Sequence, residues 1–161
     1  MRNILQELSV PPPVPVVAPP GPVKLSDWLR KKFYQAIETG WQTLEDIFGP
    51  KARTQPAFRS HTVERAKQIN LGTEAVAFVL KLNELQNQEI RVLIGVFPIG
   101  EQTHLPKNLK VKVIPESGEP DEHLAESHPT GFETEWFYEH GEKFSVEMQL
   151  DDVKVTEDFV I

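Results

Sequence analysis

The chain after residue 62 alternates apolar and polar side chains over several short stretches, which is the pattern of half-buried β-strands. Residues 75–82 and 90–96 are the clearest, because apolar side chains occupy every second position in both. Turn-like segments separate the stretches, and no helical pattern lies between them, as parallel strands would need. We therefore predict a mostly β protein, an antiparallel β-sandwich of seven to eight strands. The other alternating stretches are residues 65–71, 109–113, 132–138, 144–150 and 153–161.

Residues 26–48, ahead of the strands, have the periodicity of one long N-terminal amphipathic helix. Ser26 is the expected N-cap, and Gly49 followed by Pro50 is the expected stop signal. Gly40 lies inside the stretch, where its missing side chain is expected to let the helix approach a sheet. We predict that the apolar stripe of this helix packs on the sandwich; the alternative is that it docks on a partner. The stripe consists of Leu29, Phe33, Ile37, Trp41, Leu44 and Phe48.

The charges of this stretch run against the dipole of a single helix. Arg30, Lys31 and Lys32 fall in its first two turns, whereas Glu45 and Asp46 fall in its last. Each placement costs a few tenths of a kcal/mol at an exposed site, on the order of 0.3. Two interpretations stay open: a solvated face, or a small electropositive patch for an acidic partner. We retain Arg30, Lys31 and Lys32 as the candidate interaction patch.

The N-terminal part is dominated by the stretch SVPPPVPVVAPPGPV, which begins at Ser9. Seven of the 14 prolines lie in residues 11–22. Proline fixes φ and has no N–H, so a helix or a central strand is excluded there. We expect a proline-rich disordered tail with polyproline II character that acts as a spacer; the alternative is a docking peptide for an aromatic groove. Residues 1–24 are therefore assigned to a short segment plus linker, and residues 25–161 to the helix and sandwich domain.

The net charge of −7 and the absence of cysteine exclude several classes of function. An acidic chain is unsuited to an extended phosphate-binding surface, so we expect no nucleic acid partner. Without cysteine there are no disulfides, thiol nucleophiles or thiolate metal sites. No apolar run approaches the ~18 residues that span a bilayer, and the N-terminus lacks a signal-peptide pattern. We expect a cytoplasmic protein that does not act at a membrane.

The histidines and carboxylates have no spacing that is typical of a catalytic or metal site. His123 and His128, with Asp121, Glu122 and Glu126 nearby, are the best metal candidate, but they lack the helical spacing of a zinc motif. There is neither a nucleophile elbow nor a glycine-rich phosphate loop. We predict no catalytic residue, no metal and no cofactor. The same holds for four carboxylates that lack the glycine-containing loop of a calcium site: Asp151, Asp152, Glu157 and Asp158.

Several stretches, taken together and in order, resemble the cyanobacterial DUF1822 family, a family of unknown function. The resemblance covers most of residues 25–161 and implies lineage and domain limits, but it carries no catalytic residue. Members of the family have an additional N-terminal region, so the proline-rich stretch resembles the boundary between two parts. Whether the short N-terminus is native stays open. The matching stretches are LSDWL, GWQTLEDIFG, RAKQINLG, AVAFVLKL, GEQTHLPKNLKVKVIPESGE, GEKFSVEMQL and VTEDFVI.

These observations favour a non-enzymatic protein-interaction or regulatory module, tethered through its proline-rich spacer to an unknown protein partner. The alternative is a ligand-binding or enzymatic domain whose site is built from loops near His104 and His123. A deep pocket lined by these histidines would favour the alternative, whereas an exposed apolar patch would favour the module. The sequence leaves the partner and the oligomeric state open.

Overall fold

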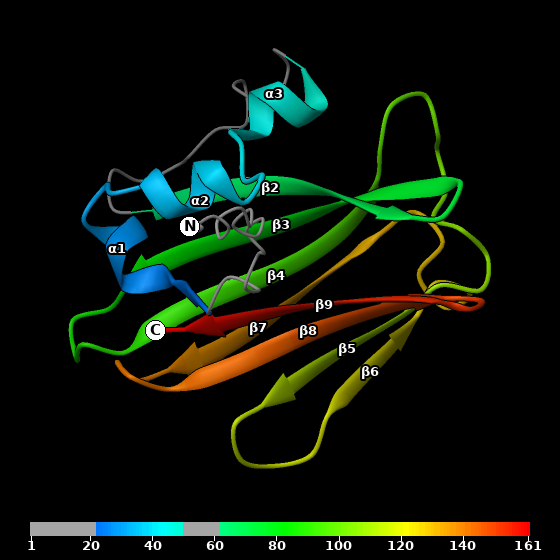
Figure 1. Ribbon diagram of the computed structural model, residues 1–161. Helices are drawn as coiled ribbons and strands as arrows, with labels where there is room; N and C mark the ends of the chain where they lie inside the picture. Colours follow the sequence, from blue (N-terminus) through cyan, green and yellow to red (C-terminus); the bar gives the residue numbers. More distant parts are fainter. Residues whose placement is uncertain (1–21, 50–61) are drawn as a thin grey trace, which may run out of the picture.

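The computed structural model describes residues 22–49 and 62–161 of the chain. Two sheets make up most of this part, one with the strand order β1-β9-β8-β5-β6 and the other with the order β2-β3-β4-β7 (Figure 1). The helices are α1 (Leu25–Leu29), α2 (Tyr34–Glu38) and α3 (Leu44–Phe48). The strands are β1 (Val23–Lys24), β2 (Thr62–Leu71), β3 (Glu74–Glu84), β4 (Ile90–Pro98), β5 (Lys110–Pro115), β6 (Asp121–Leu124), β7 (Phe132–Tyr138), β8 (Lys143–Leu150) and β9 (Val153–Val160).

A continuous hydrophobic core joins the two sheets. Phe78 of β3 and Phe159 of β9 come from different sheets, and their ring centroids lie 5.9 Å apart. Tyr138 of β7 and Phe144 of β8 stack across the same gap, with their centroids at 4.8 Å. Because successive side chains of a strand point to opposite faces, the alternation in the sequence places one apolar set in this core. The prediction of a mostly β protein is confirmed.

Two short strands lie outside the set that the sequence predicts. β6 falls outside the alternating stretches of the sequence, and it pairs antiparallel with β5 from Lys110 opposite Leu124 to Val113 opposite Asp121. β1 pairs with the end of β9 in the parallel direction, so the prediction of purely antiparallel pairing is wrong at this edge. The predictions for the proline-rich tail fall almost entirely on residues 1–21, outside the described residues.

The prediction of one long helix over residues 26–48 is wrong. Three helices of five residues each lie in this part of the chain (Figure 1). The N-cap of α1 is Lys24 rather than Ser26, which lies inside the helix. None of the helices in the described part of the chain has the length and the hydrophobicity needed to cross a membrane.

α1 ends in a Schellman motif, a pair of backbone hydrogen bonds that closes a helix. The N–H of Lys31 donates to the carbonyl of Trp28 at 2.9 Å, and the N–H of Lys32 donates to the carbonyl of Asp27 at 2.8 Å. The motif requires a left-handed backbone at the residue that follows the C-cap. Here that residue is Lys31, which has a φ of 64°. The chain therefore leaves the helical path at Lys31.

α2 ends in the same way one helix later. The N–H of Gly40 donates to the carbonyl of Ile37 at 3.2 Å, and the N–H of Trp41 donates to the carbonyl of Ala36 at 2.8 Å. Gly40 has a φ of 99°, a conformation that costs glycine little because it has no Cβ. The glycine is thus a helix stop, which corrects the interpretation that it lets a continuous helix approach a sheet.

α3 begins with a capping box. The hydroxyl of Thr43 accepts a hydrogen bond from the N–H of Asp46 at 3.2 Å, while the carboxylate of Asp46 accepts one from the N–H of Thr43 at 3.4 Å. Glu45 and Asp46 therefore lie in the first turn of a helix, and Arg30 lies at the end of one. Both placements agree with the helix dipoles, so the apparent conflict in the sequence came from assuming a single helix.

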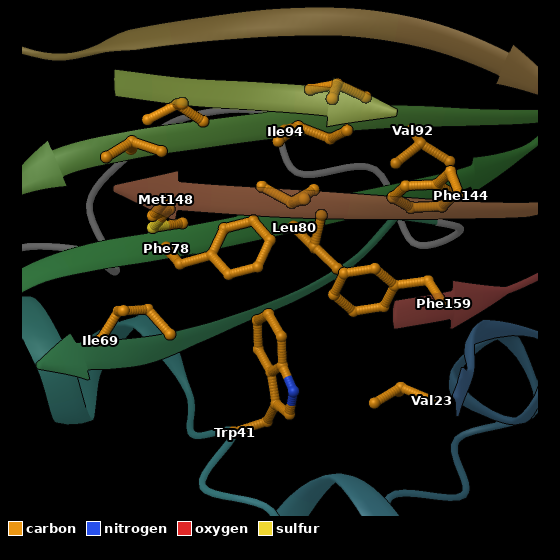
Figure 2. Packing of buried hydrophobic residues seen from close by; sticks show 14 of the residues in the cluster. Val23, Trp41, Ile69, Phe78, Leu80, Val92, Ile94, Phe144, Met148 and Phe159 are labelled. Atoms are coloured by element: carbon orange, nitrogen blue, oxygen red, sulfur yellow. The ribbon is translucent and has the colours of Figure 1, made fainter. Parts of the chain in front are cut away.

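Trp41 connects the helical segment to both sheets. Its ring centroid lies 5.2 Å from that of Phe78 and 6.0 Å from that of Phe159, and Figure 2 shows the indole pointing into the core between them. Trp28 of α1 packs on the same indole at 5.1 Å. The helices therefore close one open side of the two layers, as expected for the predicted packing.

The residue after Trp41 forms a β-bridge to the outer edge of β2. The N–H of Gln42 donates to the carbonyl of Ala66 at 2.7 Å, and the N–H of Ala66 donates back at 2.8 Å. Nearby, Lys67 of β2 forms an ion pair with Glu157 of β9 at 3.0 Å, which links the two sheets beside the helices. Backbone pairing and an ion pair thus fix this side of the molecule.

Replacing Trp41 with alanine should destabilise the protein by about 3–5 kcal/mol, because a fully buried aromatic side chain that contacts both sheets is removed. The free energy of unfolding from urea titration measures the loss. Trp41→Phe is the matched control: it keeps a ring in place, so we expect it to lose less than about 1.5 kcal/mol. Equal stability of Trp41→Ala and the wild type would contradict this account of the core.

Candidate functional site

The helices present cations beside exposed apolar side chains. Tyr34 and Ile37 of α2 are 82% and 67% exposed, which is unusual for large apolar residues. Arg30, Lys31 and Lys32 lie in the connection between α1 and α2 that directly precedes them. We call these five residues the cap surface. Its three cations were candidates from the sequence, whereas Tyr34 lies outside the predicted stripe and Ile37 was predicted to pack within it.

The packing of α2 explains why Tyr34 and Ile37 face outward. Ala36 is 1% exposed and faces the core, and Phe33 packs on Trp28 with their centroids 6.2 Å apart. Residues three apart in a helix lie on one side, so Tyr34 and Ile37 are neighbours on the side opposite the core. A stripe at helical spacing predicts burial only when the helix is continuous, and this one ends at residue 38.

Lys31 of the cap surface has a backbone conformation that a lysine rarely adopts. A left-handed backbone costs a residue with a Cβ roughly 1–2 kcal/mol, and glycine is the usual residue at this point of a Schellman motif. α2 has Gly40 at the equivalent point, whereas α1 has a lysine with an exposed side chain. Folding alone would favour glycine, so a cation at this position needs another reason.

Arg65 of β2 contacts Phe33, which lies between Lys32 and Tyr34 of the cap surface in the sequence. Its guanidinium carbon lies 3.9 Å from the centroid of the Phe33 ring, within the range of a cation–π contact. Its Nη1 also donates to the carbonyl of Glu64 at 3.1 Å. Burial lowers the pKa of the Arg65 guanidinium from its ordinary value, yet arginine stays charged at neutral pH. Arg65 thus places a positive charge against Phe33, with Asp46 and Glu64 as its charged neighbours.

Glu64 lies on the outer face of the β2-β3-β4-β7 sheet. Burial raises the pKa of its carboxyl, although Lys81 and Arg65 oppose the shift. Its Oε2 is buried and has no hydrogen-bond partner in the described part of the chain. Lys81, directly opposite Glu64 in the β2–β3 pairing, also forms an ion pair with Glu133 at 3.4 Å. Glu64 is thus a partly buried acid whose charged neighbours are Lys81, Arg65 and Glu133.

The predicted metal candidates His123 and His128 form a packing cluster with Phe132. His123 stacks on Phe132 at a centroid distance of 4.6 Å, and His128 lies 5.4 Å from the same ring. The Nε2 of His123 is 2.8 Å from Oδ2 of Asp121. Within residues 22–49 and 62–161, no group of three or more histidines and carboxylates is arranged to hold a metal ion. The cluster joins β6 to β7, a long-range contact that the sequence does not reveal.

His104 lies in the loop between β4 and β5, where its Nδ1 is 2.8 Å from the hydroxyl of Thr103. The N–H of Leu105 donates to the carbonyl of Pro129 at 2.8 Å, which joins this loop to the loop before β7. The loops of the predicted alternative site therefore meet, but His104 is exposed and His123 is engaged in packing.

The four carboxylates considered for calcium are separated by their own contacts. Asp151 lies in the β8–β9 turn with a φ of 55°. Glu157 pairs with Lys67, and Asp158 accepts a hydrogen bond from the hydroxyl of Ser145 at 2.6 Å. The oxygens of Glu157 and Asp158 are thus directed to different partners.

A cavity of about 320 Å³ lies where the β3–β4 and β7–β8 turns meet. Nearby, the Nε2 of His140 is 3.4 Å from a carboxylate oxygen of Glu84. The polar and exposed lining offers neither an apolar floor nor a buried charged group, which a specific ligand site usually has. The lining residues are Asn87, Gln88, Glu89, Glu139 and His140.

The family model described as "Protein of unknown function (DUF1822)" matches residues 17–160. No curated protein and no solved structure matches the chain. The match supports the resemblance found in the sequence but assigns no activity. Any function must therefore be inferred from the surfaces described above.

Replacing Lys31 with glycine should stabilise the protein by about 0.5–1 kcal/mol, because glycine adopts the left-handed backbone without steric cost. Chemical denaturation measures the change. Lys32→Gly is the matched control: it removes the same charge at a position without a positive φ, so we expect a loss of roughly 0.5 kcal/mol. If Lys31→Gly were no more stable than Lys32→Gly, the strain attributed to Lys31 would be absent.

Replacing Glu64 with glutamine should change how stability depends on pH. The folded state raises the pKa of this carboxyl, so the wild type binds this proton more tightly when folded. The resulting stabilisation is complete below the unfolded pKa and is lost as the pH rises above 4.5, the ordinary value. We therefore expect wild-type stability to fall relative to Glu64→Gln over that interval, as measured by urea titrations at successive pH values. A difference that grows in favour of the wild type would contradict this assignment.

Proposed function

The chain belongs to the DUF1822 family of proteins of unknown function, and we propose that it is a non-enzymatic interaction module. In this proposal a β-sandwich scaffold holds the cap surface rigidly, and the cap surface binds an acidic region of a partner protein. The proline-rich stretch serves as the spacer that tethers the module. The absence of cysteine agrees with a cytoplasmic location for this interaction.

The observation that carries the proposal is the combination of exposed apolar side chains with a strained cation. Tyr34 and Ile37 are large side chains on the solvent side of α2, whereas Ala36 occupies its buried side. Lys31 keeps its charge where glycine would be more stable. Each feature has a stability cost, and a partner that covers the apolar pair and pairs with the cation would account for both.

The electrostatic setting also favours an acidic partner. The chain carries a net charge of −7, yet three adjacent residues of the cap surface are cationic, and Arg65 contacts Phe33, the next residue but one after Lys31. Local positive charge on an acidic protein steers an acidic segment to this surface and repels it elsewhere. Tyrosine supplies a large contact area at low entropic cost and is common at the centre of interfaces.

The alternative function, a ligand-binding or enzymatic site near His104 and His123, has one supporting observation. The backbone hydrogen bond from Leu105 to Pro129 brings the two loops together. Against it, His123 has one ring face on Phe132 and its Nε2 beside Asp121, so little of the imidazole is left for a ligand. We therefore prefer the interaction module.

Affinity capture with tagged variants tests the proposal. Proteins captured by the wild type should be lost, by about tenfold or more, with Lys31→Glu/Lys32→Glu and with Tyr34→Ser/Ile37→Ser. Lys31→Gly is the informative third variant, because it removes a cation while we expect it to stabilise the fold. Reduced capture by that variant cannot come from unfolding. Capture should also weaken as the salt concentration rises.

The matched control is Lys107→Glu/Lys154→Glu, which makes the same change of charge near the β8–β9 turn, away from the cap surface. It should capture the same proteins as the wild type. Capture that is equal for all variants would overturn the assignment to the cap surface. Thermal stabilisation by a small metabolite that is lost in His104→Ala and His123→Ala would instead support the alternative.

A further inference from the structure

The two sheets have four outer edges, and they differ in how they are covered. In the described part of the chain, the backbone of Gln42 bridges the outer edge of β2 at Ala66, and β1 pairs with Phe159 and Val160 at the end of β9. β6 is an edge of only four residues. β7 is an edge of seven residues, and β4 is its one pairing partner among the described strands. β7 thus presents, on the side away from β4, a seven-residue row of backbone groups with which no strand in the described part of the chain pairs.

The sequence of β7 protects this edge only through the charge of two glutamates. Natural edge strands carry lysine, proline or a bulge, or they are short. FETEWFY has no lysine and no proline, and the regular pairing with β4 runs without a bulge from Ile90 opposite Tyr138 to Val96 opposite Phe132. Aromatic residues and threonine make up most of the strand and favour the extended conformation. The edge is therefore suited to accept another strand.

Packing holds β7 in place from its inner side. Tyr138 is 4% exposed and stacks on Phe144 of the other sheet, and Phe132 stacks on His123 of β6. Trp136 lies between them on the inner face and stacks with Tyr138 at a centroid distance of 6.2 Å. An edge fixed in this way pays little entropy when a second strand pairs with it.

The outer face of β7 offers two carboxylates and one aromatic ring. The side chains of Glu133 and Glu135 are 35% and 41% exposed, and Phe137 is 50% exposed. Lys81 lies 3.4 Å from Glu133, and Arg91 forms an ion pair with Glu135, so both carboxylates are oriented by neighbours within the sheet. A carboxylate accepts several hydrogen bonds, so each has acceptor capacity left for a cation on the far side.

These charges argue against pairing with a second copy of the chain. Two β7 strands would bring four glutamates together in an interface between two acidic proteins, and like charges on facing strands are destabilising. A strand with basic side chains would instead place them beside Glu133 and Glu135. The acidic pattern thus selects the partner as well as preventing self-association.

We propose that the β7 edge binds an extended basic segment of another protein as an additional strand. Backbone hydrogen bonds to β7 supply the pairing, lysine or arginine at alternate positions faces Glu133 and Glu135, and the aliphatic part of a third such side chain packs on Phe137. This is the recognition mode known as β-strand addition. The proposal is independent of the cap surface, which has the opposite charge and contains no strand.

A heptapeptide that alternates lysine and valine is the probe. Titrated into the 15N-labelled protein, it should slow amide hydrogen exchange in β7 by about tenfold or more while leaving β6 and β2 unchanged. The same peptide methylated at every second backbone nitrogen lacks the donors of one edge and should give no protection. A peptide that alternates glutamate and valine should also fail, because it faces like charges.

A charge exchange provides the decisive variants. Glu133→Lys/Glu135→Lys should lose protection by the basic peptide and gain it from the acidic one. Glu133→Gln/Glu135→Gln, which avoids new repulsion with Lys81 and Arg91, should weaken binding of the basic peptide by several-fold, on the order of fivefold. Glu119→Lys/Glu126→Lys, a matched change at exposed residues outside β7, should bind as the wild type does.

Three outcomes would overturn the proposal. The basic peptide could leave hydrogen exchange in β7 unchanged, or the N-methylated and the unmodified peptide could protect β7 equally. The basic peptide could also bind the charge-exchanged variant as well as the wild type. Self-association of the wild type through β7, seen as protection that rises with protein concentration without peptide, would show that a second copy occupies the edge. None of these outcomes depends on the cap surface, so the result is separable from the function proposed above.

Discussion

The packing of Trp41 between the two sheets is the contact on which the arrangement of the described residues depends. Its indole contacts Phe78, Phe159 and Trp28, so one side chain joins β3, β9 and α1 (Figure 2). The next residue, Gln42, pairs its backbone with the edge strand β2. Two adjacent residues therefore have different tasks: Trp41 fills the core and Gln42 bridges the edge strand β2. The orientation of α2, and with it the exposed side of the cap surface, follows from this anchor.

The strands could be predicted because alternation is a local property of the sequence, whereas the helix prediction failed for an equally local reason. Spacings of three and four continue across a break when each short helix contributes only one or two apolar residues. The signals of the break were present: Gly40 suits a left-handed helix end, and Thr43 with Asp46 suits a capping box. The reversed charges were the strongest signal. Arg30 suits the C-terminus of one helix and Asp46 suits the N-terminus of another, whereas both oppose the dipole of a single helix.

The candidate surfaces could be predicted only as far as they are local. The cations of the cap surface follow from the sequence, but the exposure of Tyr34 depends on where α2 begins and ends. The stacking of His123 on Phe132 joins two strands of different sheets, so spacing along the chain suggested a metal site where packing was the answer. The uncovered edge of β7 depends on strand order, which no single stretch encodes.

The two surfaces carry opposite charges on different sides of the described structure, which raises the question of whether they bind each other between copies. The cap surface lies on helices and a turn at the β2 side, and its backbone groups are engaged in the bonds that close α1 and α2. It has no extended segment to offer to the edge of β7 at the opposite end of the same sheet. Head-to-tail association would bring the charges together but leave the strand edge unpaired. The geometry therefore favours two different partners, an acidic one at the helices and a basic, extended one at β7.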